Sequence, residues 1–103
     1  SFSFEGAHGM DQMNGIMNVF RSQVNQLGGE EIVHCDDFLF GLNGLPQSNV
    51  LKFFFDDGCS VVVRPSGTEP KLKVYISVIA DDEKQALKKE KMFAQDIESY
   101  IVK

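Results

Sequence analysis

Apolar residues recur at steps of three and four along the first third of the chain, a spacing typical of one face of a helix. This stripe is formed by Met10, Met13, Ile16, Met17, Phe20, Val24 and Leu27. Asp11 is suited to cap the start of such a helix, and Gly28-Gly29 is suited to end it. The pattern predicts a helix from about residue 11 to residue 27. A methionine-rich stripe can bind a partner, but this spacing favours a role in the core.

A second helical pattern closes the chain and is preceded by the acidic run Asp81-Asp82-Glu83. Asp82 and Gln85 have the spacing of a capping box, and acidic residues favour the positive end of a helix dipole. The inner side is formed by Ala86, Phe93, Ile97 and Ile101, with Glu90 at its margin. The lysines on the outer side alternate with acids, which favours a solvated face over a nucleic-acid surface.

The segments between the helices alternate with a period of two, which predicts strands over 30–40, 49–56, 59–64 and 72–80. In the last of these, Leu72 and its alternate neighbours share one face, and Lys73, Tyr75 and Ser77 share the other. Asp57-Gly58 predicts a two-residue hairpin turn. The order of elements predicts an α+β domain, in which two helices pack on one face of a mainly antiparallel four-stranded sheet.

The composition narrows the classes of function. The chain has 103 residues, enough for one domain, and a net charge of -5, which argues against a general nucleic-acid or anionic-membrane binder. No segment resembles a membrane span or a signal peptide. Cys35 and Cys59 have no disulfide or zinc pattern, so two reduced cysteines in a cytoplasmic protein are expected. Asp36 and Asp37 are adjacent in a strand and face opposite ways, so they should not share a metal ion.

The loop between the last two strands carries the chemistry of an anion site. It reads Arg64-Pro65-Ser66-Gly67-Thr68-Glu69-Pro70-Lys71. A guanidinium offers a planar fork of donors to phosphate, hydroxyls add further donors, and glycine admits a close approach of the backbone. A stretch of proline, serine and glycine is also ordinary turn material. From these residue types alone, both an anion site and a simple connection remain open.

The same loop, followed by Leu-Lys-Val-Tyr-Ile-Ser-Val, closely resembles the C-terminal domain of the α-D-phosphohexomutases, the phosphoglucomutases and phosphomannomutases. The resemblance extends to the entry segment, with Phe4-Glu5-Gly6 and Arg21, and to the hairpin region around Ser48-Asn49-Val50-Leu51-Lys52-Phe53. It implies a TATA-box-binding-protein-like fold, with a lead-in or hinge over 1–9 and the domain over 10–103. The start of the chain at Ser1 also suggests a piece of something longer.

The resemblance further implies a role in binding the phosphate of a hexose phosphate substrate. Matched residue by residue, this role falls to Arg64, Ser66, Gly67, Thr68 and, as a second basic group, Lys73. Lys71 is a candidate by proximity alone, and Glu69 is expected to turn away from the anion.

The resemblance implies an isomerase of carbohydrate metabolism that interconverts hexose 1-phosphate and hexose 6-phosphate. The serine, Mg²⁺ and sugar loops of that family are absent from these 103 residues. The chain alone is therefore expected to be inactive, with no catalytic or metal-binding residue of its own, and to act with domains 1–3 of a longer protein. A stand-alone anion-binding or interaction module is the alternative.

Overall fold

The computed structural model describes residues 2–4, 6–41, 44, 48–66 and 69–101. Its sheet has six strands, and two helices complete the fold. In chain order the elements are β1 (Phe2–Ser3), α1 (Gly9–Ser22), β2 (Gln26–Leu27), β3 (Glu30–Asp37), β4 (Leu51–Phe55), β5 (Ser60–Pro65), β6 (Lys71–Ser77) and α2 (Glu83–Ile101).

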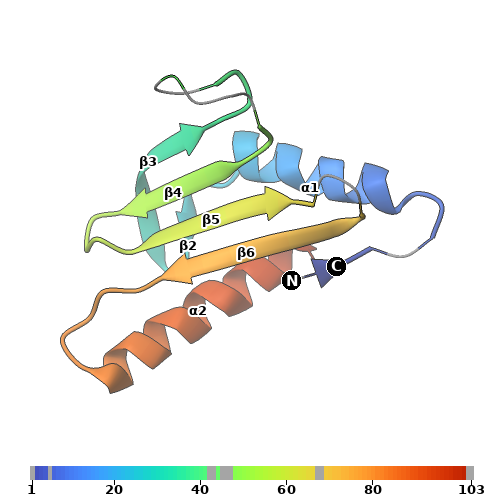
Figure 1. Ribbon diagram of the computed structural model, residues 1–103. Helices are drawn as coiled ribbons and strands as arrows, with labels where there is room; N and C mark the ends of the chain where they lie inside the picture. Colours follow the sequence, from blue (N-terminus) through green and yellow to red (C-terminus); the bar gives the residue numbers. More distant parts are fainter. Residues whose placement is uncertain (1, 5, 42–43, 45–47, 67–68, 102–103) are drawn as a thin grey trace.

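The strands are antiparallel throughout and lie in the order β1-β6-β5-β4-β3-β2. Both helices lie behind the sheet as it is drawn in Figure 1, so the opposite face is open. The α+β prediction with two helices on one face is therefore confirmed. The predicted number of strands was wrong, because two short edge strands flank β3–β6. The likeness to the TATA-box-binding protein stays a prediction.

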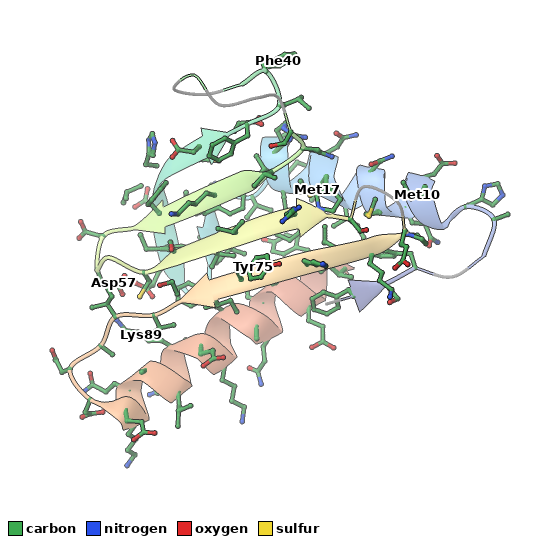
Figure 2. All side chains as sticks on the ribbon, in the orientation of Figure 1. Met10, Met17, Phe40, Asp57, Tyr75 and Lys89 are labelled. Carbon is green, nitrogen blue, oxygen red and sulfur yellow. The ribbon has the colours of Figure 1, made fainter. Side chains whose placement is uncertain are left out.

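The core lies between the open-faced sheet and the helices. More buried and less buried residues alternate in β4, β5 and β6, as the period of two predicted, whereas no residue of β3 is fully buried. The helices contribute Met13, Met17 and Phe20 from α1 and Phe93 and Ile97 from α2; the strands and the β4–β5 hairpin contribute Leu27, Leu51, Phe53, Phe55, Cys59, Val61, Val63 and Leu72. Lys73, Tyr75 and Ser77 lie exposed on the open face, as predicted, and Figure 2 labels Tyr75 there.

The end of α1 differs from its prediction. The helix ends at Ser22, and Leu27 belongs to β2, although its side chain continues the apolar stripe into the core. Gly28 and Gly29 have φ angles of 59° and 79° and form the turn between β2 and β3. A Cβ on Gly28 would lie 2.8 Å from the Phe93 ring, so glycine is needed where this turn meets α2.

Two local predictions about turns and caps are confirmed. Asp82 caps α2, since its Oδ1 accepts a hydrogen bond from the backbone N–H of Gln85 at 2.8 Å. The β4–β5 hairpin turns at Asp57-Gly58, where Gly58 has a φ angle of 88°. None of the described helices is long and apolar enough to cross a membrane.

Candidate functional site

Arg64 lies near the end of β5 and is exposed. Its neighbour Val63 is buried, so alternation places the Arg64 side chain outside the core. Arg64 pairs in register with Lys73 of β6, which is also exposed. Directly opposite residues in an antiparallel pair have Cβ atoms about 5 Å apart, so the two side chains leave the sheet from neighbouring positions. Among the described residues, neither has a carboxylate within ion-pair distance.

The loop after Arg64 is closed by its own backbone. The N–H of Ser66 donates to the carbonyl oxygen of Lys71 at 2.8 Å, and Glu69 binds Lys71 through its side chain at 3.1 Å. The expectation that Glu69 turns away from an anion is consistent with this ion pair, which also neutralises Lys71. Gly67 and Thr68, two of the predicted site residues, lie outside the described residues.

A shallow pocket of about 360 Å³ lies beside this loop, between α1, the segment entering β4 and the end of β5. It is lined by Met10, Met13, Asn14, Ser48, Asn49, Val50, Arg64, Pro65 and Ser66. Arg64 is the charged residue among them, and the polar ones carry amides and hydroxyls. Because no carboxylate is found in this described lining, the pocket suits a small anion even though the chain is acidic overall.

The start of α1 is fitted closely against the same loop. A Cβ on Gly9 would lie 2.5 Å from the backbone oxygen of Phe4 and 3.0 Å from the Cβ of Pro70. The N–H of Phe4 also donates to the carbonyl oxygen of Pro70 at 2.8 Å. The glycine therefore lets the helix, the entry segment and the loop meet, directly before Met10, which lines the pocket.

The sequence patterns did not predict an ion pair between Arg21 and Asp37, which lies next to the pocket residue Asn49. The Arg21 guanidinium, in the last turn of α1, donates to Asp37 Oδ2 at 2.7 Å and to Asn49 Oδ1 at 2.8 Å. The hydrogen bond from Arg21 holds the pKa of the Asp37 carboxyl below its usual range. Asp36 instead contacts His34 at 2.6 Å, so the two adjacent aspartates are separated as predicted. The contacts of Arg21 could not be predicted from periodicity, because they join α1 to residues that are distant in sequence.

A second polar cluster lies at the other end of the sheet, where Figure 2 labels Asp57 and Lys89. Ligand atoms of Glu30, Asp57 and Cys59 lie within 4.8 Å of one another. Lys89 of α2 donates a hydrogen bond to Asp57 Oδ2 at 2.6 Å, and its ammonium group is the positive charge beside these acidic residues. The Cys59 thiol contacts the backbone of Ile79, with 3.4 Å between Sγ and the nitrogen. These contacts give the cluster a structural role in joining the hairpin to α2.

The two carboxyls of this cluster titrate as a pair. Burial and the hydrogen bond to Asp57 raise the pKa of Glu30 to about 7. The hydrogen bonds from Glu30 and Lys89 hold the pKa of Asp57 well below its usual range. Glu30 is therefore the carboxyl of this pair that keeps its proton to the higher pH, and Asp57 carries the negative charge. Cys35 and Cys59 are both free, as the sequence predicted.

Residues 5–95 match the model of the phosphoglucomutase/phosphomannomutase C-terminal domain, and the chain belongs to this family. It is similar to the phosphoglucomutase of Staphylococcus epidermidis, at 36% identity over 79% of this chain and 17% of that protein. It is also similar to the phosphoglucomutase of Staphylococcus haemolyticus, at 34% identity over 95% of this chain and 19% of that protein.

The chain spans less than a fifth of the length of these curated relatives. The phosphoglucomutase of Staphylococcus aureus is 37% identical over 76% of this chain and 16% of that protein. No solved structure matches the chain significantly.

Proposed function

We propose that this chain is the substrate phosphate-binding domain of a phosphoglucomutase or phosphomannomutase. In the whole enzyme it holds the phosphate of a hexose phosphate while hexose 1-phosphate and hexose 6-phosphate are interconverted. Arg64 is the main charged clamp, the Ser66 hydroxyl adds a donor, and Lys73 supplies a second positive charge. Gly67 and Thr68 complete the cradle as the family resemblance implies.

The observation that carries the proposal is the state of Arg64. It lines a pocket beside Ser66, it lies opposite a second cation, and no carboxylate of the described residues neutralises either one. A phosphate dianion bound at Arg64 supplies the missing counter-charge, and Lys73 on the neighbouring strand adds to the positive potential there. The planar guanidinium also matches phosphate geometry through paired hydrogen bonds. A stand-alone anion-binding module would use the same residues, and the family match favours the enzyme domain over it.

This chain supplies binding, and we assign it no step of the chemistry. Mg²⁺ prefers octahedral oxygen ligands, whereas the acidic cluster of the described residues includes a thiol and is already occupied by Lys89. The residues present therefore do not fit Mg²⁺, which would be held elsewhere in a longer enzyme. The cytoplasm suits such an enzyme, with its two free thiols.

A titration followed by ¹⁵N NMR tests the proposal. A charge-assisted hydrogen bond contributes about 1.5–3 kcal/mol, less where water still reaches the site. Net affinity for inorganic phosphate or glucose 6-phosphate should therefore be about millimolar, or about -4 kcal/mol. Amide signals around Arg64 and Ser66 should shift with phosphate and not with glucose. Arg64→Ala should remove the response, and Lys84→Ala, which removes an exposed lysine of α2, should keep it. Equal phosphate binding by Arg64→Ala would contradict the assignment.

A further inference from the structure

Asn49 lines the same pocket as Arg64 and Ser66, and its backbone is held firmly. The N–H of Val50 donates to the carbonyl oxygen of Ser48 at 2.9 Å, which makes a three-residue turn with Asn49 at its centre. Ser48 and Val50 are both bound to the backbone of Phe38, with bonds of 2.9 and 3.0 Å. The side chain of Asn49 therefore starts from a fixed point on the wall of the pocket.

The chemistry of arginine decides which way the Asn49 amide lies. A guanidinium only donates hydrogen bonds, so the atom that faces Arg21 Nη2 at 2.8 Å must be the amide oxygen. The amide nitrogen is then directed away from Arg21, and its two N–H groups have no hydrogen-bond acceptor among the described residues. Asp37 holds the same guanidinium through bonds of 2.7 and 3.3 Å, which keeps Arg21 in place.

We propose that Asn49 is a further ligand-binding residue, whose amide nitrogen donates to an oxygen of the phosphate held by Arg64 and Ser66. The inference rests on the proposed function and adds a donor from the segment before β4, a region outside the phosphate loop. An amide donor binds a charged phosphate oxygen more strongly than it binds water. Because its orientation is fixed before binding, little conformational entropy is lost when the phosphate binds. Arg21 and Asp37 act on this site only through Asn49.

The variant Asn49→Asp tests the inference because it separates binding from structure. Aspartate keeps an acceptor for Arg21, so the ion-pair network and the melting temperature should be maintained. It loses both amide donors and adds a negative charge in the pocket, so the affinity for inorganic phosphate should fall by about tenfold or more. Asn25→Asp, which adds the same charge on the exposed segment after α1, should bind phosphate as the parent chain does.

The side-chain amide signals give a direct readout in the same titration. The Asn49 pair is assigned by its absence from Asn49→Asp, and it should shift with phosphate but not with chloride of equal ionic strength. Loss of binding in Arg64→Ala together with unchanged binding in Asn49→Asp would overturn this inference and leave the proposed function standing. Unchanged binding in Arg64→Ala would overturn the proposed function first.

Discussion

The two ends of β5 lie beside polar clusters with different charge arrangements. At the hairpin end, Asp57 binds Lys89 at 2.6 Å, and Glu30 beside it has a raised pKa. At the loop end, Arg64 and Lys73 lie opposite each other without a carboxylate among the described residues. Both ends border a pocket, and the one lined by Glu30 and Lys89 is the larger, at about 450 Å³ against about 360 Å³.

This contrast indicates that charge pairing, rather than pocket volume, distinguishes the binding end from the structural end. A neutralised cluster has little left to offer a ligand, and its contacts stabilise the docking of α2. An uncompensated pair of cations destabilises the folded chain slightly and gains from an anion. The following predictions test whether the loop end of β5 binds phosphate and the hairpin end stabilises the fold.

Phe93→Ala should produce the largest loss of stability. Phe93 is 1% exposed and its ring centroid lies 4.8 Å from that of Phe55, at the hairpin end of the core. Truncating a buried phenylalanine costs about 3–5 kcal/mol through lost burial and a residual cavity. Denaturant unfolding measures the change. A loss below about 1 kcal/mol would contradict the docking of α2 at this end.

Gly9→Ala should affect both stability and phosphate binding. The added Cβ meets the backbone oxygen of Phe4 and the Cβ of Pro70, so α1 must shift away from the loop. Overpacking of this kind costs about 1–3 kcal/mol. Phosphate affinity should fall as the pocket wall moves. Gly15→Ala is the matched control, because its Cβ meets nothing within 4 Å. It should raise stability by up to about 1 kcal/mol through helix propensity.

The smallest expected effect is a pH dependence from the hairpin end. The folded pKa of Glu30 is raised to about 7 from 4.5, so the unfolded state releases this proton at lower pH. The free energy of unfolding should therefore fall as pH rises from about 4.5 to about 7, and level off above. Thermal melts of Glu30→Gln should lack this fall, and those of Glu31→Gln, on its exposed neighbour, should retain it. Identical pH profiles for Glu30→Gln and the parent chain would contradict the raised pKa of Glu30.

Below about pH 4 the free energy of unfolding should change with pH in the opposite direction and fall as pH falls. The pKa of Asp57 is held under its ordinary value, so its contribution to stability is present above that value and is lost as pH falls.

Much of the fold could be predicted because strong periodicity marks long elements. The four central strands and both helices came from repeating patterns, and the Asp57-Gly58 turn came from its residue types. The strands β1 and β2 have two residues each, too few to show a period. The end of α1 was misjudged because Val24 and Leu27 continue the apolar stripe after the helix has ended. Their burial comes from tertiary packing, which the helical period cannot distinguish.

The candidate site could be predicted only in part. Residue types and the family resemblance predicted Arg64, Ser66 and Lys73 as site residues, which stays a prediction, and Arg64 and Ser66 line one pocket. That Lys73 lies directly opposite Arg64 depends on strand register, which the sequence does not state. The contacts of Arg21 with Asp37 and Asn49, and of Glu30 with Asp57, join residues 16, 28 and 27 positions apart. Such contacts arise only when the strands pair and the helices dock on the sheet.

The most direct test measures phosphate affinity and thermal stability together in Arg64→Ala and Asp57→Asn. Arg64→Ala should lose phosphate binding and keep the melting temperature of the parent chain. Asp57→Asn should lower the melting temperature, because it weakens the contact with Lys89, and should bind phosphate as the parent chain does. The opposite pattern, with phosphate binding lost in Asp57→Asn and kept in Arg64→Ala, would contradict the assignment of the two ends of β5.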